Sequence, residues 1–353
     1  MTELKDKNLY YVGGVVRDEI LGTSSIDTDF CYEGNAIEFA KDLNIIKENP
    51  DFGTVRVLFN DKEIDIASTR EEFYPKAGHL PEVTNIGCPL KNDLKRRDFT
   101  INAMAKNTVS GEIVDYFNGL EDIKNKKIRV LHRKSFIDDP TRIIRALKFS
   151  VRFNFELEEN TRKLQDDYLE NINYDMSFHR IKKELKETFN LNKEIAFQQF
   201  IDQGIYKLLG KNQTIPTLKG SIEDIINKYN PIYPWIIYMG LFDLSNFELT
   251  TQEKEIIESV PASCPEDEFE AYKLFNSIPR ESVMLFALKH DYQKGCEFLS
   301  KNIKIEINGK DLAALGIPQG QIYREIFDYI LRIKLSKNLT KEEELNIVKE
   351  NFL

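Results

Sequence analysis

The spacing of hydrophobic and polar positions changes along the chain and divides it into two regions. In the first 115 residues, short runs rich in β-branched and aromatic residues alternate with helical or turn-rich pieces. These runs predict strands at residues 10–12, 27–32, 55–59 and 63–67, a helix at 36–43, and a strand pair at 99–106 and 112–116 joined by a turn. The first region is therefore predicted to be mixed α/β.

From about Asp139 onward the pattern is helical. Ile143, Ile144, Leu147 and Val151 recur at the three- and four-residue spacing of one helix face. Most of the remaining sequence is rich in Lys, Glu, Leu and Ile with short breaks at prolines. We expect an α/β head over residues 1–135, a helical neck over 136–190, and a helical body and tail over 191–353.

Composition narrows the class of protein. The 353 residues are 41% hydrophobic and 30% charged, which is typical of a globular protein. No apolar run is long enough to span a membrane. The four cysteines are scattered without a CxxC pair, which argues against a zinc site and fits reduced thiols. We expect a cytoplasmic protein with no membrane association and no obligate protein partner.

The formal charge of −9 argues against a protein that coats DNA. An enzyme that contacts only part of an RNA needs no more than a local basic face, because counterion release depends on the phosphates contacted. Basic stretches occur at residues 95–97, 124–134 and 180–186. A charged stretch is more often a solvated surface. The candidates for RNA contact are Lys126, Lys127, Arg180 and Lys183.

The first cluster of candidate site residues is Gly13-Gly14-Val15-Val16-Arg17-Asp18, followed by Asp27-Thr28-Asp29. Alternation along a strand places Asp27 and Asp29 on one face, where two carboxylates favour a cation between them. Mg²⁺ is the expected occupant, and two such ions suit transfer of a nucleotide with loss of pyrophosphate. Gly13, Gly14 and Arg17 are expected to contact phosphates.

A second cluster is the run Lys95-Arg96-Arg97-Asp98-Phe99-Thr100-Ile101-Asn102. Its arginines are suited to hold triphosphate oxygens, and Asp98 and Asn102 to meet ribose hydroxyls. Asp65, on a neighbouring predicted strand, is a candidate third carboxylate. The alternative is a basic loop that enters a half-buried strand, with Asp65 exposed.

A third cluster is Asp138-Asp139-Pro140-Thr141-Arg142. Asp139 before a proline is typical of a helix start, which is a purely structural explanation. Asp139 and Arg142 also share a helix face and offer an acceptor beside a donor. Cytosine and adenine both present an amino group beside a ring nitrogen, whereas uracil and guanine present the reverse. This pair therefore fits selection of C and A.

Taken together, these motifs resemble the bacterial-type (class II) tRNA nucleotidyltransferases and poly(A) polymerases, within the polymerase β-like superfamily. The resemblance is dense from Val12 to about Leu185 and returns in the segment 307–320. It implies a nucleotidyltransferase head with a helical neck, body and tail that receive the tRNA acceptor stem.

The resemblance also implies roles for single residues. Asp27 and Asp29 would bind the metal ions, Gly14 and Arg17 the nucleotide, and Arg97 phosphate or sugar. Asp139 and Arg142 would read the base, and Arg145 would support them or bind phosphate. Lys148 departs from the family's arginine, which affects nucleotide preference rather than the metal site.

The expected activity is addition of nucleotides from CTP and ATP to the 3′ end of tRNA. Addition of the complete CCA sequence is the main hypothesis, and A-addition alone, CC-addition alone and poly(A) synthesis are alternatives. The full-length loop at residues 70–95 disfavours CC-addition. Two other readings are an inactive tRNA-binding relative, which would have no reason to retain both aspartates, and a nucleotidyltransferase for small molecules, which would not need the helical half.

Overall fold

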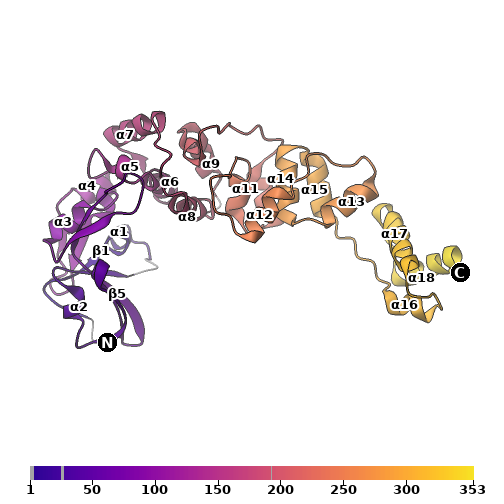
Figure 1. Ribbon diagram of the computed structural model, residues 1–353, viewed down its shortest axis with the longest axis horizontal. Coiled ribbons are helices and arrows are strands. Elements are labelled where there is room, and N and C mark those ends of the chain that lie inside the picture. Colours follow the sequence, from indigo (N-terminus) through magenta and orange to yellow (C-terminus); the bar gives the residue numbers. More distant parts are fainter. Residues whose placement is uncertain (1–3, 25–27, 192) are drawn as a thin grey trace. The chain divides into compact units, whose positions relative to one another are not determined.

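The computed structural model describes residues 4–24, 28–191 and 193–353 (Figure 1). The described chain forms two compact units. The first runs to residue 213 and includes residues 243–248, and the second holds residues 214–242 and 249–353.

The first unit is built on a seven-stranded sheet with the order β3-β4-β5-β2-β1-β8-β9. Strands β2 and β5 run parallel, and the other neighbouring pairs are antiparallel. The strands are β1 (Leu9–Val12), β2 (Asp29–Tyr32), β3 (Asn44–Asn49), β4 (Thr54–Phe59), β5 (Lys62–Ser68), β8 (Met104–Asn107) and β9 (Ile113–Asp115). A separate antiparallel pair is formed by β6 (Arg70–Phe73) and β7 (Glu82–Ile86).

Helices cover both faces of the sheet. Phe30 and Cys31 alternate along β2, and each belongs to a different apolar cluster. The cluster of Phe30 includes Ala36 and Ala40 beside α2, and that of Cys31 includes Leu90 and Leu94 of α3. The helices of this region are α1 (Gly14–Ile20), α2 (Ala36–Phe39), η1 (Pro50–Phe52), α3 (Leu90–Lys95), η2 (Thr100–Asn102) and α4 (Gly119–Lys124).

The rest of the first unit is mainly helical and is organised around α6, whose residues are mostly buried. The helix packs against α8 and α9. Its sequence repeats apolar residues at helical spacing, as predicted, and Asn154 ends it in the left-handed conformation. The elements are β10 (Lys127–Ile128), α5 (Ser135–Asp138), α6 (Thr141–Phe153), β11 (Glu156–Leu157), α7 (Glu159–Glu170), α8 (Phe178–Phe189), α9 (Glu194–Asp202) and η3 (Ile205–Leu209).

The described part of the second unit is helical. Its last three helices share an apolar cluster that includes Ile307, Leu312, Ile326 and Val348. The buried carboxylate of Glu344 accepts hydrogen bonds from the backbone N–H groups of Glu306 and Ile307 and pairs with Lys334. These contacts hold the segment that precedes α16 against α18. The helices are α10 (Ile222–Tyr229), α11 (Pro234–Met239), α12 (Thr251–Glu258), α13 (Glu268–Asn276), α14 (Arg280–Lys289), α15 (Tyr292–Ser300), α16 (Gly309–Ala314), α17 (Gln321–Ser336) and α18 (Lys341–Phe352).

The predicted fold class, an α/β head followed by helices, is confirmed. The predicted strand at residues 99–106 is wrong in its first half, where the 3₁₀ helix η2 precedes β8. The apolar alternation there arises because Phe99 and Ile101 are buried on a tight turn rather than along a strand. The division into head, neck, and body with tail stays a prediction.

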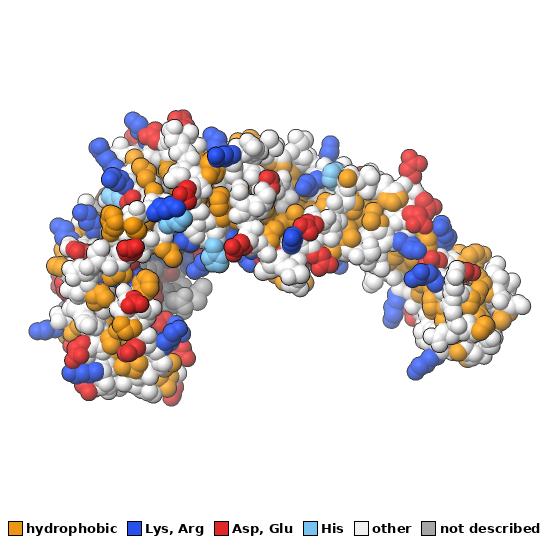
Figure 2. Space-filling model, viewed as in Figure 1, with side chains coloured by type: hydrophobic (Ala, Val, Ile, Leu, Met, Phe, Trp, Pro, Cys, Tyr) orange, Lys and Arg blue, Asp and Glu red, His pale blue; other side chains and the backbone are white. Residues whose placement is uncertain are grey.

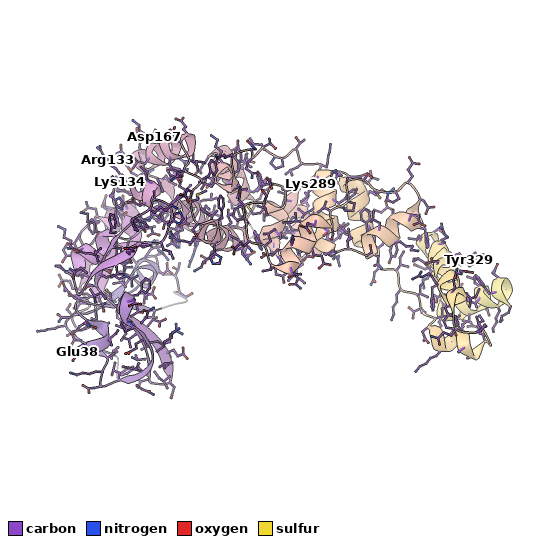
Figure 3. The ribbon with its side chains drawn as sticks, viewed as in Figure 1. Glu38, Arg133, Lys134, Asp167, Lys289 and Tyr329 are labelled. Atoms are coloured by element: carbon purple, nitrogen blue, oxygen red, sulfur yellow. The ribbon has the colours of Figure 1, made fainter. Side chains whose placement is uncertain are left out.

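Charged side chains of both signs are interspersed over the visible face rather than gathered in one patch (Figure 2). Arg133 and Lys134, from the basic stretch at residues 124–134, are exposed beside the start of α5 (Figure 3). Among the described residues, no helix is both long and apolar enough to cross a membrane.

Candidate active site

A tight turn between β1 and α1 forms one wall of the candidate site. Gly13 lies just before α1 with φ 72° and ψ −127°, a conformation that favours glycine. A Cβ atom at this position would lie 2.9 Å from Nη1 of Arg97. The Gly13 turn and the Arg97 side chain are therefore in direct contact, although they are 84 positions apart in the sequence. The structure thus joins the first two predicted clusters.

A cleft of about 1070 Å³ lies within the first unit. Among the described residues that line it, ten are Lys or Arg and six are Asp or Glu. This local excess of positive charge contrasts with the net charge of −9 for the chain. The predicted residues that line the cleft are Gly13, Gly14, Arg17, Asp29, Arg97, Asp98, Asn102, Asp139, Arg142, Arg145, Arg180 and Lys183.

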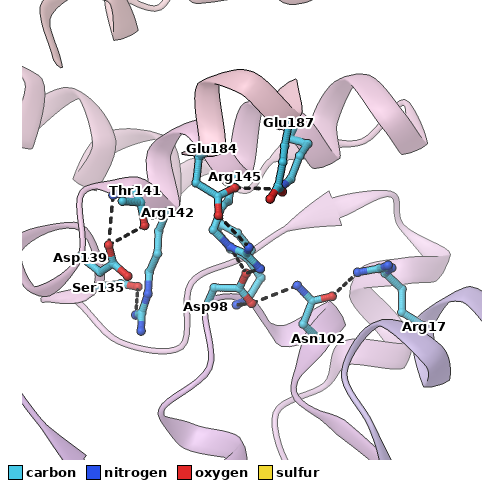
Figure 4. Close-up of polar contacts among 12 residues, drawn as sticks. Arg17, Asp98, Asn102, Ser135, Asp139, Thr141, Arg142, Arg145, Glu184 and Glu187 are labelled. Atoms are coloured by element: carbon cyan, nitrogen blue, oxygen red, sulfur yellow. Dashed lines mark hydrogen bonds and ion pairs between the residues drawn. The ribbon is translucent and has the colours of Figure 1, made fainter. Parts of the chain in front are cut away.

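A chain of polar contacts crosses the cleft (Figure 4). Nη1 of Arg17 donates to the amide oxygen of Asn102, whose Nδ2 donates to Asp98 at 2.9 Å. Nε and Nη2 of Arg145 donate to the other oxygen of Asp98 at 2.9 and 2.6 Å. Arg145 also reaches Glu184 on α8. The network fixes Asp98 and Asn102 between α1 and α6.

The charge of Arg145 sets the ionisation of Asp98. Burial by itself would raise the pKa of Asp98, but the charge of Arg145 and hydrogen bonds from Asn102 and Arg145 outweigh it and lower that pKa to about 2. Burial likewise would lower the pKa of Arg145, yet Asp98 and Glu184 raise it. Asp98 is therefore an anion at neutral pH, able to accept hydrogen bonds but not to donate them.

The two arginines of the second cluster are held by one buried carboxylate. Asp93 is fully buried and accepts from Nε and Nη2 of Arg96 and from Nη2 of Arg97. Burial would raise its pKa, but the charges of Arg97 and Arg96 lower it. Asp93 also accepts the backbone N–H of Arg70. This residue, missed in the sequence, orders the basic side of the cleft.

Asp139 and Arg142 are both buried at the cleft, with 5% and 4% of their surface exposed. Oδ1 of Asp139 accepts the backbone N–H and the hydroxyl of Thr141, so the structural role at the helix start is present (Figure 4). Arg142 donates to Ser135 at 2.7 Å and to the backbone carbonyl of Arg96 at 2.9 Å. The pair is thus rigidly held before any ligand arrives.

The predicted metal aspartates are described only in part. Asp27 lies outside the described residues. Asp29 is exposed at the start of β2 and lines the cleft, and Asp65 is its register partner on β5. Both oxygens of Asp65 accept hydrogen bonds from Arg56, at 2.7 and 2.8 Å. In the described part of the chain no three His, Cys, Asp or Glu side chains are grouped to hold a metal ion.

The four candidates for RNA contact occupy different environments. Lys183 lines the cleft, and Arg180 reaches across it to Asp139. Lys127 pairs with Glu156 at 2.9 Å, and Lys126 is exposed at a turn with φ 55°. Lys126 and Lys127 do not line the cleft. Of the four candidates, the structure therefore places only Arg180 and Lys183 at the cleft.

Several cleft residues were not among the predicted nucleotide-binding or metal-binding residues. Lys148 donates to Glu184 at 2.7 Å and Glu187 at 2.6 Å, and Arg152 pairs with Asp18. Lys148 and Arg152 continue the α6 face of Arg145 at three- and four-residue spacing, which is the signal that predicts them. The other missed charged residues of the lining are Arg70, Glu72, Glu184 and Glu187.

Part of the first unit matches a known protein family, and the chain is similar to several curated proteins. Residues 9–129 match the family described as the poly A polymerase head domain. The A-adding tRNA nucleotidyltransferase of Aquifex aeolicus is 49% identical over 163 residues, 44% of this chain and 20% of that protein. That of Geobacter sulfurreducens is 27% identical over 96% of this chain and 44% of that protein. The CCA-adding enzyme of Lactobacillus helveticus is 34% identical over 68% of this chain and 58% of that protein.

Solved structures agree over a longer span. The apo form II of a CCA-adding enzyme has a TM-score of 0.78 and 28% identity, over 98% of this chain and 92% of that chain. The CCA-adding enzyme of Thermotoga maritima, solved with tRNA, has a TM-score of 0.74 and 26% identity over 98% and 91% of the two chains. Similar CCA-adding enzymes were also solved with CTP and with ATP.

The fold is that of a nucleotidyltransferase-type head followed by a helical region. Residues 9–129 match the poly A polymerase head domain family, and the predicted resemblance is confirmed. The chain spans between a fifth and about three fifths of the length of these curated relatives.

Proposed function

We propose that this chain transfers nucleotides from CTP and ATP to the 3′ end of tRNA and completes the CCA sequence. The observation that carries the proposal is the single cleft around which the Gly13 turn, Asp29, Arg97 and the Asp139–Arg142 pair meet. These are the parts needed to bind a triphosphate, hold a metal ion and select a base. The reaction joins the RNA 3′ oxygen to the α-phosphorus, and pyrophosphate leaves.

The residues present fit a magnesium site at the cleft edge. Asp29 presents a carboxylate there, beside Asp65 on the adjacent parallel strand, and Mg²⁺ prefers carboxylate and phosphate oxygens. Asp27 and Asp29 would hold two Mg²⁺ ions, with Asp65 as a further candidate. Such ions, when bound, would activate the RNA hydroxyl and neutralise the charge that develops on the phosphates.

The protein's own side chains would supply positioning and electrostatics. Arg97 and Arg17 would meet the triphosphate, because both line the cleft next to the Gly13 turn. Asp98 would accept a ribose hydroxyl hydrogen bond, for which its lowered pKa is suited. Arg145 would hold Asp98 in place and so act on the ribose through it. In phosphoryl-type transfer, such positioning accounts for much of the rate.

Base selection would depend on Asp139 and Arg142. The carboxylate would accept from the amino group of cytosine or adenine, and the guanidinium would donate to the ring nitrogen. Uracil and guanine place a carbonyl opposite the carboxylate and a ring N–H opposite the guanidinium, so both contacts would be repulsive or unpaired. The burial of both side chains strengthens this discrimination.

A-addition alone is a second candidate, which the similarity to the A-adding enzymes of Aquifex aeolicus and Geobacter sulfurreducens favours. The decisive experiment offers labelled CTP, ATP, UTP and GTP separately to tRNAs that end at position 73, at C74 and at C75. CCA addition predicts CTP use on the first two and ATP use on the third. A-addition predicts ATP use on the third alone, CC-addition predicts CTP use alone, and continued ATP addition indicates poly(A) synthesis. Incorporation of UTP or GTP at comparable rates would contradict the proposed role of Asp139 and Arg142.

A further inference from the structure

Arg180, on α8, joins two segments that border the cleft. Its Nη2 donates to Oδ2 of Asp139 at 2.5 Å, and its Nη1 donates to the backbone carbonyl of His79 at 3.1 Å. His79 belongs to the connection between β6 and β7, residues 74–81, which we call the strap. One guanidinium therefore contacts both the strap and the carboxylate proposed to read the base.

The strap is itself anchored next to this contact. The N–H of Gly78 donates to the carbonyl of Asp138, and the N–H of Ser177 donates to the carbonyl of Gly78, both at 3.0 Å. His79 and Lys76 of the strap also pair with Asp175. The strap is thus held by Asp138, which precedes Asp139 in the chain, and by Ser177, which precedes α8.

The two oxygens of Asp139 have different partners. Oδ1 accepts from the N–H and hydroxyl of Thr141, within its own turn, and Oδ2 accepts from Arg180 on another helix. Donors on both oxygens fix the plane of the carboxylate. A carboxylate oxygen can accept more than one hydrogen bond, so Oδ2 retains capacity for a ligand's amino group.

We propose that Arg180 is a positioning residue for nucleotide selection: it sets the plane of the Asp139 carboxylate and ties that plane to the position of the strap. This inference depends on the proposed base-reading role of Asp139. Arg180 acts through Asp139 and the strap, and the geometry requires its planar fork. A lysine ammonium is a point charge that does not span both acceptors in a fixed plane.

The test compares Arg180→Gln and Arg180→Lys with Lys186→Gln. The last variant removes a positive charge from the same helix, at a residue that does not line the cleft. For each variant, kcat and KM are measured for ATP and for GTP on a tRNA that ends at C75. We expect Arg180→Gln to lower the ATP-over-GTP ratio of kcat/KM at least tenfold, Arg180→Lys to lower it partly, and Lys186→Gln to leave it unchanged.

A purely structural role for Arg180 predicts an equal loss with both nucleotides and a lower Tm. A role confined to RNA binding predicts a higher KM for tRNA with the same ratio. Either outcome would overturn the inference. If Arg180→Gln does not fold, Arg180→Lys decides, because an unchanged ratio in a folded lysine variant also contradicts the role of the fork.

An Asp139→Asn variant separates this inference from the function on which it rests. If its ATP-over-GTP ratio equals that of the unmodified protein, the base-reading role of Asp139 is wrong. If that ratio falls while the Arg180→Gln ratio does not, Asp139 reads the base and only the positioning role of Arg180 is wrong. If both fall, the double variant is expected to fall no further than Asp139→Asn, because Arg180 acts through Asp139.

Discussion

Asp29 and Asp65 are register partners on the parallel strands β2 and β5, so their side chains leave the same face of the sheet. Their surroundings nevertheless differ. Asp29 lines the cleft, whereas both oxygens of Asp65 are bonded to Arg56, its own partner on β4. The two carboxylates therefore occupy matching positions in the sheet, but they differ in their contacts and in their access to the cleft.

This difference predicts unequal effects on catalysis. Asp29→Asn is expected to lower kcat by at least about 10³-fold, because the loss of a proposed metal ligand would remove several kcal/mol of transition-state stabilisation. Asp27→Asn is expected to do the same. Asp65→Asn is expected to lower kcat by less than about tenfold, since Arg56 already engages both oxygens of Asp65. Single-turnover incorporation at several Mg²⁺ concentrations measures the effects, and an equally large loss for Asp65→Asn would make it a third ligand.

Gly13→Ala is expected to raise the KM for nucleotides roughly tenfold or more, because the new methyl group would lie 2.9 Å from Nη1 of Arg97 and displace it. Gly111→Ala is the matched control. Its φ of 73° nearly equals that of Gly13, and no heavy atom lies within 4 Å of the position that its new methyl group would take. Both variants place an alanine at a positive φ, which L side chains rarely adopt. Similar kinetics in the two would show that strain, and not Arg97, causes the effect.

The ion pair of Asp98 predicts a pH dependence of stability. The pKa of Asp98 falls from an ordinary value of 3.8 to about 2 in the folded protein. The stabilisation, about 2 kcal/mol, is present above about pH 4 and is lost as pH falls through 2. The difference in stability between Asp98→Asn and the unmodified protein should therefore be smaller at pH 2 than at pH 7.

Amide hydrogen exchange of η2 and β8 is the measurement for Asp98, with both proteins compared at the same pH. Fluorescence is unsuitable, because the single tryptophan, Trp235, lies in the second unit. A constant difference between the two proteins from pH 7 to pH 2 would mean that Asp98 is not held in its charged form by folding.

Asp93→Asn is expected to destabilise the first unit by about 3–5 kcal/mol, because it leaves two arginines beside a fully buried site without their carboxylate. Hydrogen exchange of α3 and β6 would measure the loss. Asp42→Asn, at an exposed position in the same unit, is the control. A change below about 1 kcal/mol would show that water or neighbouring acids replace Asp93.

Motifs with fixed spacing predicted much of the candidate site from the sequence. The cluster Gly13–Arg17, the run from Arg97 to Asn102 and the pair Asp139 and Arg142 do meet at one cleft, although their roles stay predictions. Asp93 was missed although Arg96 and Arg97 follow it at three- and four-residue spacing. Its complete burial, and its bond from the backbone N–H of Arg70, 23 positions away, have no local signature in the sequence.

The fold was predicted where periodicity is strong. The helix α6 follows an uninterrupted apolar repeat and was placed well. Strand β3 was missed, because all six of its residues are exposed and an edge strand needs no apolar alternation. Strands β6 and β7 were also missed. They pair only with each other among the described strands, and neither has a buried residue, so their sequences show no apolar alternation of a core strand.

The basic lining of the cleft belongs to an acidic chain, so the remaining surface is more negative than the total charge indicates. A polyanion that approaches this remaining surface meets a repulsive field on average, whereas the cleft offers a potential well. Under the proposed function, this distribution would favour the approach of a triphosphate and an RNA end to the cleft over the rest of the surface.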